Sequence, residues 1–523
     1  MNRQEQHAHT ARLAVAAFVL AVLPLLWPTI PPLTDVPGHI GRYHLMLGRG
    51  SASIAQWYSF EWHLVPNLGA DLIVSMVAPG IGLIHAVKLV ALAIPPLTLA
   101  ACVCLSRVVH GQVSPTAFLA VPFAYNQAFQ IGFLNYTLAM AGAIAAIALW
   151  LRLGAPRHTW LRACLMLAIS VIIWVIHAFG WAALVLAVAA AELRKHLKEG
   201  RSPVRAAIGA VIACLPLAPP LILTIFWRSG SAGTTEGFFD LDTKLLAFAA
   251  MLRDRWAVWD LIGVGVLGAG VYVAYRRKWI TGSHLLLWSA GSWVVGFLLL
   301  PKWLFGSGLA DVRLAPYAAL LALVALRPVH SRERLITMAV GIFVTARIAG
   351  LTISLGLYGQ SVDAELRALD YLPRGVRLVS LVSPGCAGEW GSERLDHLGS
   401  IALAYRDVFT NDQWVLPGAQ LVSIRPPVGA APFTADPSQF LHCEKGQVIQ
   451  ALRRVPRAAF DYVWVIKADE RPPATMPGFR RLWSADSSAL YLIEGGVTPR
   501  SGGPVPLGSW VHRRSGAMPS RSS

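Results

Sequence analysis

Long apolar runs recur through most of the chain, and short polar connections separate them. About eleven runs have the composition of membrane-crossing helices, for which a straight crossing needs roughly 20 residues. They cover residues 11–30, 84–107, 114–127, 131–151, 161–176, 178–193, 204–226, 258–275, 281–300, 313–327 and 334–356. This pattern predicts a mainly α-helical, polytopic transmembrane bundle over residues 1–357, with a large first outer loop over 31–83.

The first run and the shortest runs need separate interpretation. No small-x-small cleavage site follows run 11–30, which ends near Pro28, so we interpret it as a retained helix and not as a signal peptide. Four runs are too short for a straight crossing: 114–127, 161–176, 178–193 and 313–327. We expect them to end below the lipid surface or to line a cavity.

Basic residues are concentrated in every second connection. With the N-terminus inside, the predicted cytoplasmic connections contain most of them: Arg107, Arg152, Arg157, Arg162, Arg194, Lys195, Lys198, Arg201, Arg205, Arg276, Arg277, Lys278, Arg327, Arg332 and Arg334. This is the positive-inside pattern. It predicts a bacterial-type inner membrane protein with a cytoplasmic N-terminus, and the odd number of spans places everything after residue 357 outside.

The composition changes after the last apolar run. An amphipathic helix is predicted at 361–372 and a second helix at 448–455. Four strands and a hairpin turn are predicted at 377–382, 420–425, 462–468, 489–494 and 484–488. Residues 358–494 are therefore expected to form an extracytoplasmic α/β domain, and the Gly-, Pro- and Ser-rich residues 495–523 a disordered tail.

Composition supports a membrane protein over a soluble enzyme. Hydrophobic residues make up 55% of the chain and charged residues only 14%, whereas a globular protein carries about 25% charge. The formal net charge of +17 would suit nucleic acid. We attribute it to cytoplasmic loops facing anionic lipid, because no basic patch with stacking aromatics lies outside them.

The six cysteines fall into two groups. Four lie in apolar runs and are expected to be packing residues: Cys102, Cys104, Cys164 and Cys214. Cys386 and Cys443 are the two cysteines of the external domain, where an oxidising compartment would allow a disulfide.

Ionisable and polar residues gather in the predicted outer connections. The first outer loop contains Asp35, His39, Arg42, His44, Glu61, His63, Asn67 and Asp71. A helix starting near Pro37 would place His39 and Arg42 on one face, and we expect it to lie on the membrane plane as an amphipathic helix. Later outer turns contribute Tyr125, Asn126, Gln127, Gln130, Asn135, His177, Lys302, Asp311 and Arg313.

Ionisable groups at membrane depth are costly and point to function. Because the spans are short, we expect these groups around a water-filled cavity open to the outer side. His177 has a competing interpretation as a satisfied kink between two helices. Arg347 lies within a span, and the sequence leaves open a structural ion pair with Asp71 or a contact with an anion.

This arrangement resembles the GT-C superfamily of polytopic glycosyltransferases, which includes protein mannosyltransferase-like and aminoarabinose transferase-like enzymes. In that superfamily the first outer loop begins with the catalytic acid, and Asp35 in Leu33-Thr34-Asp35-Val36-Pro37 holds that place. A loose version of the His-Pro-Pro-Leu stretch of bacterial relatives is Trp62-His63-Leu64-Val65-Pro66-Asn67. The chain departs from the pattern in having Val36 where many relatives have a second acid, and Asn67 after Pro66.

The resemblance implies a polyprenyl-phosphate sugar as donor and a glycan, lipid or protein of the cell envelope as acceptor. Donor phosphate would be held by Lys302 and Arg313, with Arg347 as a further candidate. Candidate substrate-binding residues are His39, Arg42, His63, Asn67, Asp71, Asn126, Gln130 and His177. No metal is assigned, since His39, His44 and His63 would form a site only if the loop folded them together.

The chemistry of sugar transfer can also be argued from residue types. A carboxylate can deprotonate the acceptor hydroxyl as general base, and a guanidinium can hold the departing phosphate with two hydrogen bonds. Asp35 suits the first role and Arg313 the second. The chain contains no GxxxxGK[ST] or GxGxxG nucleotide-binding motif.

Two other functional classes compete with an enzyme. A transporter or flippase of lipid-linked substrate would be expected to show inverted repeats, and residues 181–357 do not repeat the pattern of 1–180. A non-enzymatic scaffold presenting the external domain would need neither Asp35 nor a recessed arginine. In the external domain, we expect Asp396, His397 and Arg406 to be surface or core-edge residues.

Overall fold

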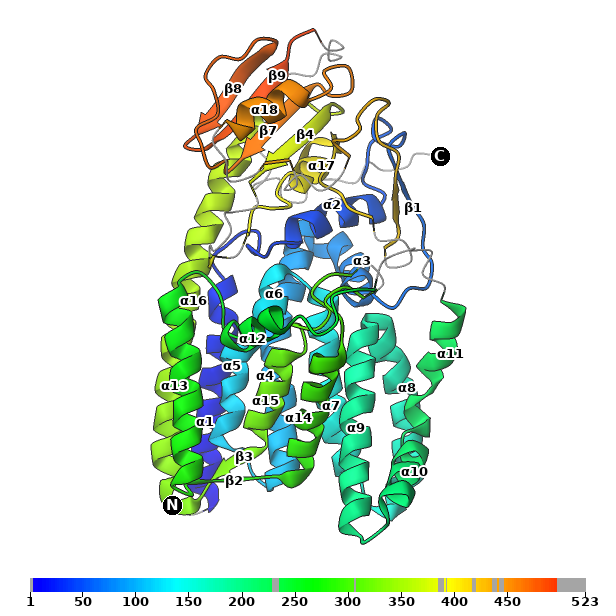
Figure 1. Ribbon diagram of the computed structural model, residues 1–523, viewed down its shortest axis with the longest axis vertical. Coiled ribbons are helices and arrows are strands. Elements are labelled where there is room, and N and C mark those ends of the chain that lie inside the picture. Colours follow the sequence, from blue (N-terminus) through cyan, green and yellow to red (C-terminus); the bar gives the residue numbers. More distant parts are fainter. Residues whose placement is uncertain are drawn as a thin grey trace, which may run out of the picture.

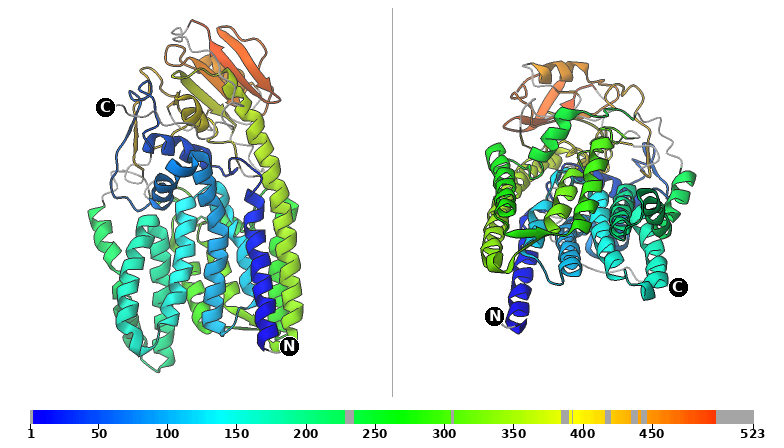
Figure 2. Two further views of the ribbon diagram at one scale, coloured as in Figure 1. Left: turned by 180° about the vertical axis from the view of Figure 1, so that it is seen from behind. Right: turned by 60° about the horizontal axis from the view of Figure 1, so that its bottom comes forward.

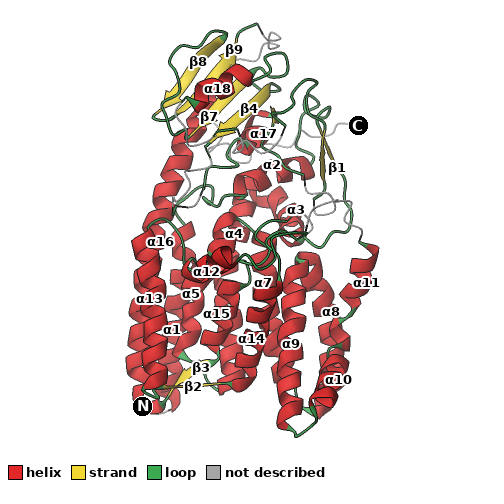
Figure 3. Cartoon of the chain, in the orientation of Figure 1, coloured by secondary structure: helices red, strands yellow, loops and turns green. Residues whose placement is uncertain are grey.

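The computed structural model of the chain describes residues 3–227, 235–304, 307–383, 390–391, 393–415, 420–434, 440–441 and 446–495. Helices form a bundle along the long axis of the molecule, and a β-sheet lies beyond one end of it (Figures 1 and 3). We call this end of the bundle the sheet end. Both Cys386 and Cys443, and the predicted tail from residue 496 on, lie outside the described residues.

The bundle helices coincide with the apolar runs. They are α1 (Arg3–Val22), α4 (Leu83–His110), α5 (Ala120–Ala124), α7 (Leu134–Arg152), α8 (Thr159–Ile176), α9 (Ala178–Lys198), α10 (Pro203–Ala213), α11 (Pro219–Phe226), α13 (Ala257–Arg276), α14 (His284–Leu299), α15 (Ala315–Val324) and α16 (Glu333–Leu366). Seen from behind, α1 lies beside α16, so the first and last helices of the bundle are neighbours (Figure 2).

The predicted count of eleven spans is not confirmed. In the described part of the chain, five helices are long and apolar enough to cross a membrane, or six if α10 and α11, bent by 44° at their junction, form one span. Several other runs fold as shorter helices. The ten residues of α15, for example, rise about 15 Å, which is half of a bilayer core.

Prolines explain where several helices stop or bend. Helix α1 ends at Val22, and Pro24 lies within the 3-10 turn that follows it at Leu23–Leu25. Pro216 and Pro219 separate α10 from α11. A proline ring removes one backbone donor and clashes with the preceding turn, so an apolar run that contains prolines divides into shorter pieces.

The C-terminal segment (residues 367–495) contains a mixed five-stranded sheet in the order β5-β4-β7-β9-β8. Its strands are β4 (Arg377–Val382), β5 (Phe409–Thr410), β7 (Tyr462–Ile466), β8 (Phe479–Ala485) and β9 (Ser488–Ile493). Strand β4 is parallel to β5 and β7, whereas β9 is antiparallel to β7 and β8. The helices of this segment are α17 (Ser400–Arg406) and α18 (Gln447–Arg454).

The first loop and the C-terminal segment pack as one body. Strand β1 (Tyr58–Phe60) of the loop pairs antiparallel with β6 (Val422–Ile424). Ile54 and Trp57 of the loop are buried in the same hydrophobic core as residues of β4 and β7. Parts of the loop are therefore packed into the C-terminal segment, while residues 61–64 remain exposed.

Two predicted elements of this region differ from the structure. The helix near Pro37 forms as α2 (Val36–Met46), but it is buried on nearly all sides and does not lie exposed on a membrane plane. It packs between α17 on one side and α3 (Gly69–Ile81) and α4 on the other. The separate amphipathic helix predicted at 361–372 is instead the continuation of α16, which runs unbroken to Leu366 and is followed by a 3-10 turn.

At the opposite end of the bundle, β2 (Ile280–Gly282) pairs with β3 (Leu326–Pro328), near the N-terminus (Figure 1). Arg276 is the last residue of α13 and Arg327 lies within β3. Some of the basic residues of the predicted cytoplasmic connections therefore lie at this end of the bundle. Two short helices at the sheet end, α6 (Gln127–Ile131) and α12 (Leu241–Ala249), complete the described elements that position the site.

Candidate functional site

Asp35 lies directly before α2, at the junction between the bundle and the C-terminal segment. Its backbone N–H donates to the carbonyl of Ile131 at 2.7 Å, and its own carbonyl accepts from His39 N–H at 2.9 Å. Pro37 favours helix initiation at this point because its fixed φ suits a first turn. The Asp35 side chain does not cap α2, and 15% of it is exposed.

One turn between α6 and α7 brings Asp35 and Arg313 to the same place. Gly132 has a φ of +103°, and a Cβ built on it would lie 3.0 Å from the Cβ of Asp35. The next residue, Phe133, has its ring 3.8 Å from the guanidinium carbon of Arg313. The charge of Asp35 favours the charged form of Arg313. The two residues therefore share one site although their positions in the sequence are far apart.

Replacing Gly132 by Ala is expected to destabilise this turn. An Ala there would have to adopt a left-handed backbone conformation, at a cost of about 1–2 kcal/mol, and its methyl group would press on Asp35. Thermal unfolding of the full chain in detergent should show a lowered midpoint. The matched control is Gly142→Ala within α7, where the new Cβ would make only ordinary contacts with Ile173 at 3.6 Å. Equal midpoints for the two variants would contradict the expectation.

Arg42 anchors a buried polar network next to Asp35. Its guanidinium pairs with Asp71 at 3.0 Å, and both side chains are almost fully buried. Asn135 donates to Asp71 at 3.2 Å and to the Asn67 side chain at 3.0 Å. Asp35 acts electrostatically on Arg42 as well as on Arg313. The structure thus gathers four predicted site residues, Asp35, Arg42, Asn67 and Asp71, around α2.

Two buried guanidinium nitrogens at this site are unsatisfied. The Nε atoms of Arg42 and Arg313 have no hydrogen-bond partner among the described residues. Arg313 uses an Nη atom for Ser307 at 3.1 Å. An unsatisfied buried donor is costly, and such donors beside a cationic cluster suit an anionic ligand or ordered water.

Three other predicted site residues have local structural partners. Asn126 caps α6, where its side-chain oxygen accepts from Ala128 N–H at 3.0 Å. Gln130 donates to the carbonyl of Tyr125 at 2.8 Å. His177 caps α9 by accepting from Phe179 N–H at 3.1 Å, which favours the interpretation as a kink residue between α8 and α9.

Three predicted residues lie apart from the Asp35 cluster. His63 is exposed and its ring hydrogen-bonds the carbonyl of Glu61. Lys302 is partly exposed and lies 3.9 Å from Asp240. One interpretation of the sequence expected Arg347 to pair with Asp71, but it does not. It is buried and forms an ion pair at 2.8 Å with Asp260, whose α13 packs beside α16.

Arg347 also donates to two backbone carbonyls, those of Leu252 and Trp259. Its donors are therefore used within the protein, and the geometry favours the structural ion pair over a contact with donor phosphate.

The sequence interpretation missed His397, which belongs to the site. His397 is 8% exposed and Arg406 is likewise buried, whereas Asp396 is partly exposed. Of the expected surface or core-edge positions, the core edge fits Asp396, and a surface position is wrong for His397 and Arg406. The Nε2 of His397 lies 3.9 Å from Asp35 Oδ1, and its Nδ1 lies 3.0 Å from Asp412 Oδ1. Trp414 packs against the His397 ring with centroids 4.2 Å apart. No sequence motif signalled this, because the contact joins two distant segments.

The two histidines near Asp35 have opposite electrostatic environments. Burial alone would lower the pKa of His397, but its hydrogen bond to Asp412, with the charges of Asp412, Asp396 and Asp35, raises it to about 10. Burial, with the charge of Arg42, lowers the pKa of His39 well below its ordinary value. At neutral pH, His397 is therefore charged and His39 neutral.

Among the described residues, no group of three or more His, Cys, Asp or Glu side chains is arranged to hold a metal ion. His44 and His63, two members of the histidine set considered from the sequence, are separated: His44 pairs with Asp407 at 2.8 Å, while His63 is exposed. Cys102, Cys104, Cys164 and Cys214 are free thiols.

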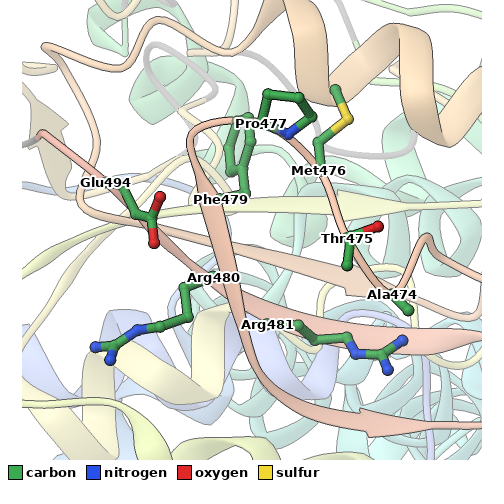
Figure 4. A pocket seen from close by; sticks show the side chains of 8 residues that line it. All are labelled: Ala474, Thr475, Met476, Pro477, Phe479, Arg480, Arg481 and Glu494. Atoms are coloured by element: carbon green, nitrogen blue, oxygen red, sulfur yellow. The ribbon is translucent and has the colours of Figure 1, made fainter.

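A groove of about 580 Å³ lies on the C-terminal segment, lined by none of the predicted site residues (Figure 4). Its lining includes Arg480 and Arg481 of β8, with Glu494 nearby. Figure 4 shows the two arginines extending to opposite sides of the strand, as successive strand residues do.

No known family model and no curated protein matches this chain. Among solved structures, it is similar to the arabinofuranosyltransferase AftD from Mycobacteria, with 13% sequence identity and a TM-score of 0.41. The match covers 92% of this chain and 40% of that chain, so this chain spans well under half of AftD's length. A likeness this distant carries no argument about activity, and the functional assignment depends on the site itself.

Proposed function

We propose that this chain is a membrane glycosyltransferase of the GT-C type, which transfers a sugar from a polyprenyl-phosphate donor to a cell-envelope acceptor. The observation that carries this proposal is the convergence of three cations, Arg42, Arg313 and His397, on the partly exposed carboxylate of Asp35. Burying several charges is costly unless they are paired, and we take several buried cations around one partly exposed carboxylate to favour an enzyme over a passive scaffold.

The reaction needs the two kinds of group that meet here. Transfer from a sugar phosphate places positive charge on the sugar ring and growing negative charge on the leaving phosphate. Asp35 would accept the proton of the acceptor hydroxyl, so that the oxygen attacks the anomeric carbon. Arg313 would hold the phosphate as the bond to the sugar breaks, using donors that include its unsatisfied Nε. Arg42, which is paired with Asp71, acts on Asp35 electrostatically.

The position of the site suits a donor that is anchored in lipid. Helix α2, which follows Asp35 directly, lies where the bundle ends and the C-terminal segment begins (Figure 1). In this proposal a headgroup would reach Asp35 while the polyprenyl tail stays between helices. In this proposal the sheet end faces the outside and the end with β2 and β3 faces the cytoplasm, in agreement with Arg276 and Arg327 at the latter. Lys302, partly exposed, would meet the donor phosphate as it approaches.

The test uses the purified full chain reconstituted in liposomes of bacterial lipids, with a crude envelope extract as acceptor. We expect it to consume one of a panel of radiolabelled polyprenyl-phosphate sugars (mannose, glucose, arabinose and aminoarabinose) and no nucleotide sugar. Asp35→Asn should not consume the donor, while Asp242→Asn, an exposed acid on α12, should behave as wild type. Movement of labelled lipid across the bilayer without loss of its sugar would instead identify a flippase.

A further inference from the structure

His397 comes from the C-terminal segment but faces the carboxylate of the first loop. Its Nε2 is 3.9 Å from Asp35 Oδ1, while its other ring nitrogen is held by Asp412 at 3.0 Å. We propose that His397 is a positioning residue for Asp35, so that the C-terminal segment supplies a charged part of the active site and not only a surface for recognition. This inference rests on the proposed function, in which Asp35 is the general base.

The ring of His397 is held at one nitrogen and on one face. Asp412, which accepts from Nδ1, also accepts from Ser400 N–H at 2.7 Å, and its carbonyl accepts from the Ser400 hydroxyl at 2.9 Å. Trp414 packs against the ring face. A histidine whose Nδ1 is bound to a carboxylate presents its Nε2 in a defined direction. Here that direction is toward Asp35.

The groups around this pair decide its charge. Asp35 faces Arg42, Arg313 and His397, while His397 faces Asp412, Asp396 and the neutral ring of His39. Three carboxylates around one imidazole keep it protonated at neutral pH. A protonated imidazole beside Asp35 favours the carboxylate over the carboxylic acid, and a general base must be in the carboxylate form to accept a proton.

The residues that hold the charged His397 in place also hold the C-terminal segment against α2. Gln413, next to Asp412, donates to the carbonyl of Gly38 at 3.0 Å. A side chain at Gly38 would collide with the ring of Trp414, so the glycine permits the close approach of the two segments. Displacement of the segment would remove His397 from Asp35, and Asp35 would then lose one of the cations that act on it.

The experiment measures the protonation of Asp35 directly, without a sugar donor. Dicyclohexylcarbodiimide reacts with protonated carboxyl groups in apolar surroundings, and peptide mass spectrometry reports its addition at Asp35 of the full chain in detergent across a pH series. In His397→Gln, we expect the midpoint of labelling to move to higher pH by about 1–3 units, the usual effect of one nearby opposite charge. His397→Lys, which keeps a cation, should stay close to wild type, and so should His63→Gln at an exposed position.

His397→Asn tests the same loss of charge with a second neutral side chain, in case His397→Gln does not fold. Its midpoint of Asp35 labelling should move to higher pH in the same direction as in His397→Gln. Equal midpoints for wild type and a folded His397→Gln or His397→Asn variant would overturn the inference. Failure of the proposed function is a different result: the midpoint would still move, but Asp35→Asn would keep full sugar transfer.

Discussion

Asparagine in place of Asp35 is expected to lower the rate of sugar transfer by about 10²- to 10⁴-fold, the usual contribution of a general base. The amide has nearly the same shape as the carboxylate but cannot take up the proton of the acceptor hydroxyl. Because the donor phosphate is held by arginines in this proposal, KM for the donor should change much less than kcat. Initial rates with the active donor of the panel, at saturating acceptor, measure both constants.

The control for Asp35→Asn is a variant that loses another carboxylate and keeps Asp35. Asp242→Asn on α12 provides it, because Asp242 is exposed. Asp242→Asn should keep the thermal unfolding midpoint of the wild type. Asp35→Asn removes an anion from among buried cations and should lower the midpoint, so its rate is measured on folded protein. Full activity of a folded Asp35→Asn variant would refute the assignment of Asp35 as the base, whatever the sugar is.

The periodicity of apolar and β-branched residues predicted local structure well. Strand β4 forms at 377–382 as expected, and the turn at 484–488 joins β8 to β9. These elements depend on neighbouring residues, which the sequence contains directly. The number of spans could not be obtained in the same way, because apolar composition does not distinguish a complete crossing from a short helix such as α15, buried among its neighbours.

The meeting of Asp35 with Arg313 follows from features that the sequence contains, since both residues stand at helix ends on the same side of the bundle. The position of His397 beside Asp35 does not follow from such features. It depends on how the C-terminal segment seats on α2, and no residue near His397 encodes that orientation. An amphipathic pattern has the same limitation: the apolar positions of α2 predicted a buried face, but the pattern does not say whether lipid or protein covers it.

Arg347 illustrates a further limit. A cation within a span requires an anionic partner, and this requirement was recognised from the sequence. The choice of partner depends on which helices are adjacent, and α13 brings Asp260 to Arg347 while Asp71 is already paired with Arg42. Which helices are neighbours depends on the tertiary structure. The sequence therefore indicated that Arg347 needs an anionic partner, but not that this partner is Asp260.

Arg394→Met is expected to cause the largest loss of stability among substitutions outside the cluster around Asp35. The Arg394 guanidinium is fully buried and pairs at 2.7 Å with Asp254, donates to the Pro32 carbonyl at 2.8 Å and contacts Gln130. It therefore joins the C-terminal segment to the stretch that precedes Asp35. Its loss leaves a buried carboxylate without its cation, which typically costs about 3–5 kcal/mol.

Arg374→Met is the matched control for that substitution. Arg374 also pairs with an aspartate, Asp407 at 2.9 Å, but 53% of its side chain is exposed. Solvent screening limits such a pair to at most about 1 kcal/mol. Thermal unfolding in detergent should therefore show a much lower midpoint for Arg394→Met than for Arg374→Met, and limited proteolysis should cut Arg394→Met faster at the junction with the bundle. Similar midpoints for both variants would mean that Arg394 does not hold the segment in place. In that event other contacts must hold His397 beside Asp35. The next variant to test would be one that removes the hydrogen bond from Gln413 to the Gly38 carbonyl.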